Sequence, residues 1–115
     1  MDFSLTEKQR QFREEVRDFL KAEIAKGIYP FGSMHLAGAL SKEFSKEVVR
    51  KGWIGLAWPK EHGGQGLGYT DRIIMLEEMF RVAAPMAYHY MGDRQVGPGL
   101  IHFGSDFLKG QFLPK

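Results

Sequence analysis

The sequence contains no cysteine. This absence excludes disulfide scaffolds, thiolate metal sites and cysteine nucleophiles. There is also no run of the roughly 18 apolar residues that a membrane-spanning helix needs. Sixteen lysine and arginine residues balance fourteen aspartate and glutamate residues without any basic cluster, so nothing marks a nucleic-acid surface. We therefore expect neither a nucleic acid nor a membrane among the partners.

A secretory signal is missing as well. Met1-Asp2-Phe3-Ser4 leads directly into a charged helical pattern instead of an apolar segment with a cleavage site. We expect a cytoplasmic protein, or one that reaches an organelle lumen without a readable signal. The 115 residues, 43% apolar and 26% charged, suit one globular domain. That length is short for an enzyme with a large cofactor.

The clearest helical pattern begins at Thr6. Thr6 and Gln9 fit a capping box, in which two side chains satisfy the first free backbone amides. An apolar stripe of 3.6-residue period then occupies Phe12, Val16, Phe19, Leu20 and Ile24. Gly27 can cap the carboxyl end and Pro30 blocks continuation. These signals predict a helix over residues 7–25.

The middle of the chain alternates loops and helices. Residues 27–40 have a loop pattern with room for a short helical turn. Ser41 is a good N-cap for a second helix that Gly52 closes. Residues 53–69 contain five glycines and a proline, which predict an irregular loop anchored by two tryptophans.

A third helix is predicted after a cap at Thr70 or Asp71, and Pro85 ends it. Its apolar residues occupy two faces, which predicts burial on most sides: Ile73, Leu76, Phe80 and Ala83 on one face, and Met75, Met79 and Val82 on the other.

Two more helical segments complete the expected fold. Residues 86–103 have a helical pattern broken by glycines, so we expect one kinked helix or two short ones, around 86–94 and 96–103. Gly104 and Ser105 break and recap the chain before a last short helix that Pro114 stops. No strand pair is convincing. The predicted fold is all-α, an array or bundle of five to six helices.

The glycine run over residues 62–68 resembles a phosphate-binding loop only superficially. A dinucleotide fingerprint beginning at Gly64 would need glycine where Tyr69 stands, and no Lys-Ser/Thr ending of a P-loop is present. We favour a tight structural turn, in which glycine permits a positive φ angle.

Other polar groups give no catalytic or metal-binding pattern. The four histidines, His35, His62, His89 and His102, lack any ligand spacing. Neighbouring residues on a helix diverge by about 100°, so Glu77 and Glu78 cannot form a carboxylate pair, and we expect both to be solvated. The same expectation applies to Lys60-Glu61-His62.

The segment Met86-Ala87-Tyr88-His89-Tyr90-Met91 is more informative. On a helix, Ala87 and Met91 lie four residues apart, and Tyr88 and Met91 lie three apart, so they share one face. This face combines small, aromatic and flexible apolar groups, and methionine adapts to varied apolar ligands. Core packing and a ligand-lining surface are both open at this point, with core packing favoured by spacing alone.

Several motifs taken in order resemble a known family. The most specific is Gly-Trp-Ile-Gly-Leu-Ala-Trp-Pro-Lys-Glu-His-Gly-Gly-Gln-Gly at 52–66. The others are Leu-Thr-Glu-Lys-Gln at 5–9, Val-Arg-Asp-Phe-Leu at 16–20, Leu-Glu-Glu at 76–78 with Pro85, Gly-Pro-Gly-Leu at 97–100, Phe-Gly-Ser at 103–105 and Phe-Leu-Pro at 112–114. Together they resemble the N-terminal helical domain of FAD-dependent acyl-CoA dehydrogenases, from about Phe3 to the last residue.

The resemblance implies a three-part oxidoreductase of lipid metabolism and fatty-acid β-oxidation. Residues 1–115 would be its N-terminal helical domain, without the middle β domain and the C-terminal helical bundle that hold FAD with help from a neighbouring subunit. Such enzymes convert an acyl-CoA to the trans-2-enoyl-CoA and pass electrons to an electron-transferring flavoprotein. A homo-oligomer is therefore expected, and the 115-residue chain alone should be inactive and free of flavin.

The resemblance assigns no catalytic, cofactor-binding or metal-binding residue to this chain. It does imply that the helix before Gly92 lines the acyl pocket. The matching positions, Ala87, Tyr88 and Met91, are thus expected to bind substrate. The bulk of Tyr88 could shorten or reshape the pocket, and branched or cyclic acyl groups stay open as substrates. The glycine run is structural in this interpretation.

Two alternatives stay open. The chain could be a stand-alone, non-catalytic helical interaction module, or part of a relative such as an acyl-CoA oxidase or nitroalkane oxidase. One departure from the family pattern is the segment 105–110, where Phe107 and Leu108 replace a polar run common among relatives. We hypothesise that these two side chains contact a partner or another domain.

Overall fold

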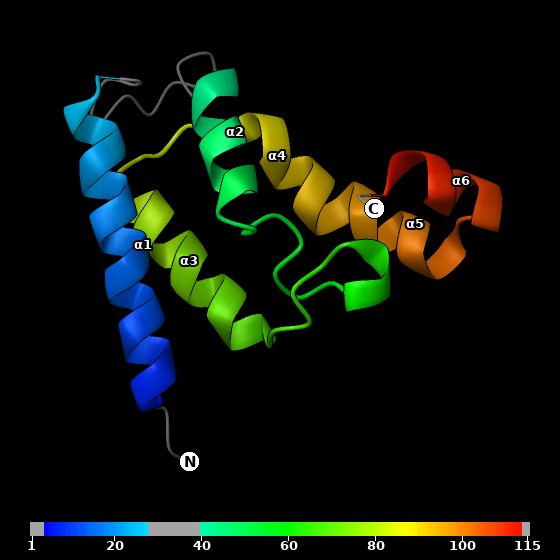
Figure 1. The fold of residues 1–115 in the computed structure, drawn as a ribbon, viewed down its shortest axis with the longest axis horizontal. Coiled ribbons are helices and arrows are strands. Elements are labelled where there is room, and N and C mark those ends of the chain that lie inside the picture. The colour runs from blue at the N-terminus through cyan, green and yellow to red at the C-terminus, as the bar shows by residue number, and fades with distance from the viewer. Residues whose placement is uncertain (1–3, 28–39, 114–115) are drawn as a thin grey trace.

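The computed structural model describes residues 4–27 and 40–113, which form helices joined by loops (Figure 1). Their order is α1 (Glu7–Ala25), α2 (Lys42–Arg50), the 3-10 turn η1 (Lys60–His62), α3 (Tyr69–Arg81), α4 (Ala87–Met91), the π turn η2 (Gly92–Val96), α5 (Gly97–Phe103) and α6 (Asp106–Phe112). The described residues form no strand, and an isolated backbone bridge joins Leu40 to Met86. The all-α prediction is confirmed. Most of the predicted loop over 27–40, with His35, lies outside the described residues.

The first helix matches its prediction because its signals are local. The Gln9 backbone N–H donates to Thr6 Oγ1 at 3.2 Å, and the Gln9 side-chain oxygen accepts from the Thr6 N–H at 3.0 Å. This reciprocal pair is the predicted capping box. The helix ends at Ala25, as its sequence pattern predicts.

Helices α2 and α3 begin with different kinds of cap. Ser41 Oγ accepts from the Phe44 N–H at 3.1 Å, as predicted. The cap of α3 is Gly68, so the prediction of Thr70 or Asp71 is wrong. Asp71 instead lies inside the first turn, where its carboxylate accepts from the Gly68 N–H at 3.2 Å.

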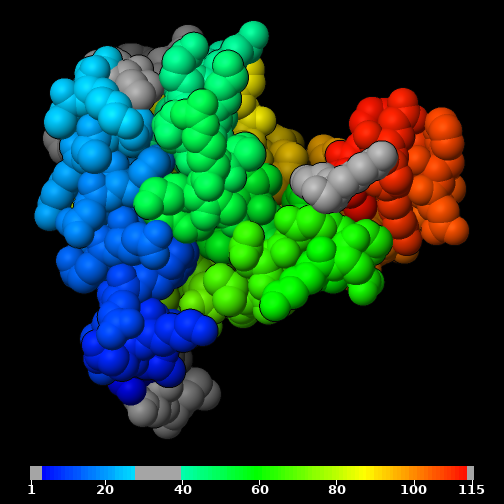
Figure 2. All heavy atoms as spheres, viewed as in Figure 1, coloured from blue at the N-terminus to red at the C-terminus, as the bar shows by residue number. Residues whose placement is uncertain are grey.

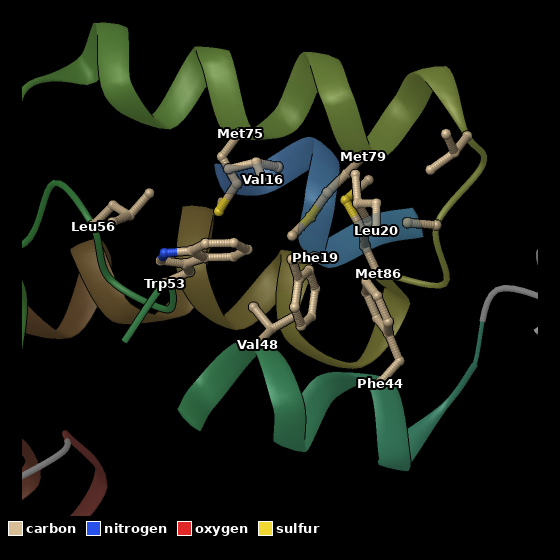
Figure 3. Packing of buried hydrophobic residues seen from close by; sticks show 12 residues of the cluster. Val16, Phe19, Leu20, Phe44, Val48, Trp53, Leu56, Met75, Met79 and Met86 are labelled. Carbon is tan, nitrogen blue, oxygen red and sulfur yellow. The ribbon is translucent and has the colours of Figure 1, made fainter. Parts of the chain in front are cut away.

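One apolar cluster holds α1, α2, α3 and the following loops together (Figure 3). Trp53 packs edge-on against Phe19, with ring centroids 5.0 Å apart. Each buried aliphatic or aromatic side chain of this kind contributes about 1.5–3 kcal/mol relative to exposure. The fully or nearly buried members are Val16, Phe19, Leu20, Phe44, Val48, Trp53, Leu56, Met75, Met79, Val82, Ala84 and Met86.

Burial of α3 is narrower than predicted. Met75, Met79 and Val82 are buried, but Ile73 and Phe80 are 53% and 59% exposed. Helix α3 packs against α1 (Figure 1), and Ile73 and Phe80 remain exposed on its other apolar face.

The segment after Pro85 is one continuous helical rod. The π turn η2 joins α4 directly to α5, where the glycine pattern predicts a kinked helix or two separate ones. Figure 2 shows α5 and α6 as a lobe at one end of the molecule. On this lobe Phe107 is 75% exposed and Leu108 37% exposed. No helix of the described residues is long and apolar enough to cross a membrane.

Candidate functional site

The predicted substrate-binding residues lie together on α4. Tyr88 and Met91 are each about half exposed, and Ala87 is partly buried. The ammonium of Lys42 on α2 lies 6.0 Å from the centre of the Tyr88 ring. The face of Ala87, Tyr88 and Met91, called here the α4 face, is therefore an amphipathic surface whose aromatic and thioether groups are accessible.

The neighbouring residues of α4 anchor this face from two sides. His89 Nδ1 is 2.9 Å from Ser45 Oγ, and the His89 ring lies 6.2 Å from the ring of Phe44 on α2. Tyr90 packs edge-on against Phe80 of α3 at 6.1 Å. A short helix is thereby fixed between α2 and α3 with the α4 face left open.

His89 is neutral in the folded protein at neutral pH. Burial lowers the pKa of His89 to about 4, since a buried imidazolium would lose its hydration. Its Nε2 atom has no hydrogen-bond partner among residues 4–27 and 40–113. The ring therefore acts as an anchor for α4, and its pKa lies well below the range useful for proton transfer at neutral pH.

The glycine run is a structural loop, as predicted. The backbone amides from Gly63 to Leu67 all donate to backbone carbonyls of residues 55–60. Gly64 packs so closely on Trp58 that an added Cβ would lie 2.1 Å from the Trp58 carbonyl oxygen. No amide of this run is left to hold a phosphate, which a P-loop requires.

The same loop is attached to the π turn. Asp93 Oδ1 accepts from the Gly55 N–H at 2.5 Å, and the Asp93 carbonyl accepts from the Trp58 indole N–H at 2.9 Å. A Cβ on Gly97 would lie 2.0 Å from the Trp58 ring. The sequence motifs gave no role to Asp93, although its spacing of four residues from Gly97 fits two residues on one helix face, and both contact Trp58.

Glu78 corrects another expectation. Glu77 is exposed as predicted, but the Glu78 side chain is only 2% exposed. Its carboxylate accepts from Arg13 at 3.2 Å, from Arg17 at 2.9 Å and from Arg81 at 3.0 Å. Burial opposes ionisation of Glu78, yet hydrogen bonds from Arg17 and Arg81 outweigh it and lower the pKa of Glu78.

This cluster joins α1 to α3 and has a structural character. Arg13 and Arg17 are one helical turn apart on α1, which was the available sequence signal for a buried acid opposite them. The three side chains that donate to the Glu78 carboxylate are all arginines, two from α1 and one from α3, so the cluster cross-links the two helices.

The remaining polar candidates lie on the surface and form no larger cluster among the described residues. His62 is 3.8 Å from Glu61 on the surface turn η1, and His102 is exposed on α5. Within the described ranges, no three acidic or histidine side chains are grouped to hold a metal ion. The α4 face, with its anchors and the attached loop, is therefore the candidate site.

Comparison with known proteins places the chain in a family. The family model for the acyl-CoA dehydrogenase N-terminal domain matches residues 6–115. Acyl-CoA dehydrogenase IpdE1 of Mycolicibacterium smegmatis is 33% identical over 112 residues, covering 92% of this chain and 29% of that protein. Mitochondrial isovaleryl-CoA dehydrogenase of Pongo abelii is 30% identical over 112 residues, covering 96% of this chain and 26% of that protein.

A solved structure agrees. The ChsE4–ChsE5 complex of Mycobacterium tuberculosis contains a chain with a TM-score of 0.74 and 28% identity, and the similarity covers 99% of this chain and 28% of that one. The chain thus spans less than a third of the length of these relatives. The match over residues 6–115, the helical order and the shared fold show that the chain belongs to the acyl-CoA dehydrogenase N-terminal domain family.

Proposed function

We propose that this chain forms the N-terminal domain of a flavin-dependent acyl-CoA dehydrogenase. The enzyme would remove two hydrogens from the α and β carbons of an acyl-CoA thioester and release the trans-2-enoyl-CoA. The observation that carries the proposal is the family match over residues 6–115. The accessible α4 face supplies a surface of the right chemistry at the position where the family resemblance expects the acyl group.

In this proposal the chain binds and orients, and does not itself react. Tyr88 and Met91 would contact the acyl chain, and Ala87 would leave room beside them. Apolar contact along one face excludes water from the acyl group and holds it in one orientation. His89 and Tyr90 would keep the face in place through their contacts with α2 and α3.

The glycine run does not fit the phosphate-binding part of a flavin site. The amides of the glycine run are bonded within the loop, so they offer no cradle for the pyrophosphate of FAD. We therefore place FAD and the catalytic base outside this chain, in the regions that the longer relatives possess.

The partners follow from the same proposal. An acyl-CoA would be the substrate and an electron-transferring flavoprotein would accept the electrons, in the cytoplasm. The similarity to a chain of the ChsE4–ChsE5 complex supports assembly into an oligomer, for which we expect copies of one subunit. Phe107 and Leu108 are candidate contacts; unchanged self-association and stability after both are replaced by serine would remove them from the proposal.

The alternatives lead to different chemistry. A stand-alone interaction module would bind another protein and no acyl-CoA. An oxidase relative would pass electrons to oxygen, and a nitroalkane oxidase relative would act on a different substrate class. The module is distinguished from the enzymes by flavin content, and the enzymes from each other by substrate and electron acceptor.

The test compares the protein from the complete reading frame with the 115-residue chain. We expect the complete protein to be yellow and to be bleached by some members of an acyl-CoA panel, with turnover when an artificial electron acceptor is added. The 115-residue chain should be colourless and inactive. A complete reading frame that ends at Lys115, or a longer product without flavin, would contradict the proposal and favour the interaction module.

A further inference from the structure

The π turn η2 lies directly after the α4 face and is attached to the loop that follows α2. Asp93, in this turn, is only 4% exposed. Its carboxylate holds the Gly55 amide, its carbonyl holds the Trp58 indole, and Gly97 just beyond the turn leaves space for the Trp58 ring. A side chain, a backbone carbonyl and a glycine of one short segment thus contact the same loop.

The turn needs such support. A π turn has poorer hydrogen-bond geometry than an α-helix, and such turns occur mainly as single insertions near functional sites. An unsupported segment would be expected to relax to α-helical hydrogen bonding, which changes the rotation of one end of the rod relative to the other. The contacts of Asp93 hold the turn against that change.

The location of Asp93 connects the turn to the α4 face. Asp93 follows Met91 by two residues, and α4 itself has only five residues. A rotation of the turn therefore reaches Met91 first, because no anchored residue lies between them, whereas His89 and Tyr90 lie between the turn and Tyr88. Burial raises the pKa of Asp93, and the hydrogen bond from the Gly55 N–H opposes that rise because it stabilises the ionised carboxylate.

We infer that Asp93 is a positioning residue that sets the orientation of the α4 face and thereby the acyl-chain selectivity of the enzyme. The inference rests on the proposed function, since it concerns the same substrate surface. It goes beyond that proposal by assigning selectivity to a residue outside the α4 face and to the loop that this residue bonds through Gly55 and Trp58.

The experiment uses the enzyme from the complete reading frame. Asp93→Ala removes the acceptor of the Gly55 amide, whereas Asp93→Asn keeps one acceptor oxygen, removes the charge and replaces the second oxygen by an NH2 group. We expect Asp93→Ala to change the ratio of kcat/KM for a long against a short straight-chain acyl-CoA by about fivefold or more, because small displacements of positioning groups have large kinetic effects. Asp93→Asn should restore the ratio to within about twofold of wild type, with the flavin content unchanged in both.

Two further variants complete the test. Asp106→Ala changes an exposed aspartate at the start of α6 and should leave the ratio unchanged. Trp58→Phe keeps an aromatic ring but loses the indole N–H that donates to the Asp93 carbonyl. It should shift the kcat/KM ratio in the same direction as Asp93→Ala, and it tests the inference if Asp93→Ala does not fold.

The outcomes separate this inference from the proposed function. A folded Asp93→Ala enzyme with the wild-type ratio overturns the inference alone, as does an Asp93→Asn enzyme altered as much as Asp93→Ala. If Asp93→Ala does not fold, a Trp58→Phe enzyme with the wild-type ratio overturns it. A wild-type enzyme that oxidises none of the acyl-CoAs overturns the proposed function and this inference with it.

Discussion

At the scale of single residues, Glu78 is a buried acid whose ionised form depends on its arginine partners. It is 1% exposed and bound by three arginines, so its ionised form is stabilised by hydrogen bonds that replace water. We expect Glu78→Gln to lower the free energy of unfolding by about 2–4 kcal/mol, because arginines lose the charge that compensates their partial burial. Chemical denaturation of the 115-residue chain measures this effect.

Glu77→Gln is the matched control. Glu77 pairs with Arg13 at 2.8 Å, but its side chain is 56% exposed. Water screens such a pair, so the control should change stability by less than about 1 kcal/mol. Equal losses in the two variants would contradict a special role for the buried carboxylate.

His89 predicts an acid-dependent loss of stability. Its pKa is about 4 when folded and near its ordinary value of 6.5 when unfolded, so the unfolded chain binds the proton more tightly. The stabilising contribution is complete above pH 6.5 and falls as the pH drops toward 4. A pKa shift of this size, discounted for the partial exposure of the ring, corresponds to roughly 1–3 kcal/mol.

The measurement is the difference in unfolding free energy between pH 7 and pH 4 for wild type and for His89→Gln. We expect a smaller difference in the variant, since glutamine does not titrate. His102→Gln, which changes an exposed histidine, should keep the wild-type difference. A His89→Gln profile identical to wild type would show that this ring does not carry the acid sensitivity.

At the scale of the element, the end of α3 is strained. Ala83 has a φ angle of +50°, in the left-handed region that favours glycine. The Ala83 N–H bonds to the Phe80 carbonyl and the Ala84 N–H to the Met79 carbonyl, which is the Schellman pattern with alanine in the glycine position. Ala83→Gly should therefore raise the unfolding free energy by about 0.5–1 kcal/mol and Tm by a few degrees.

Ala22→Gly supplies the comparison within α1. Ala22 is exposed inside a regular helix, so the same chemical change there should cost about 1 kcal/mol. If Ala83 has the described conformation, thermal unfolding should show a higher Tm for Ala83→Gly and a lower Tm for Ala22→Gly than for wild type. A loss of stability in both would contradict it.

Elements whose signals are local could be predicted from the sequence. The capping box at Thr6 and the stripe through Val16 and Leu20 fix α1 without help from distant residues. The cap of α3 was misplaced because Asp71 acts from within the first turn on Gly68. An acidic residue near a helix start fits both positions, and the sequence pattern alone favoured the wrong one.

At the scale of the whole molecule, the burial of Glu78 and the support of the π turn were missed because both depend on contacts between distant segments. Glu78 is buried by Arg13 and Arg17, which lie more than 60 positions earlier. The π turn is held by a loop 35–38 residues before it. The pattern of the α4 face was predicted, but its orientation depends on these long-range contacts and could not be.

The rod formed by α4, η2 and α5 packs closely against Trp58, which belongs to the loop after α2. A methyl group at Gly97 would overlap the Trp58 ring at 2.0 Å, whereas a Cβ on Gly99 would meet nothing within 4 Å. We expect Gly97→Ala to lower the unfolding free energy by about 1–3 kcal/mol through overpacking. Gly99→Ala lies in the same helix and should be neutral or stabilising by up to about 1 kcal/mol, since alanine is the better helix former.

Unfolding of the Gly97→Ala variant also shows whether the molecule unfolds as one unit. If Trp58 joins the rod to the core, the indole fluorescence and the helical circular dichroism of Gly97→Ala should change in one transition at lower denaturant concentration than in wild type. Separate transitions would mean that the rod can detach while α1, α2 and α3 stay folded. An unchanged midpoint in Gly97→Ala would contradict the packing of Trp58 against the rod, because a well-packed contact cannot take an added methyl group without displacement.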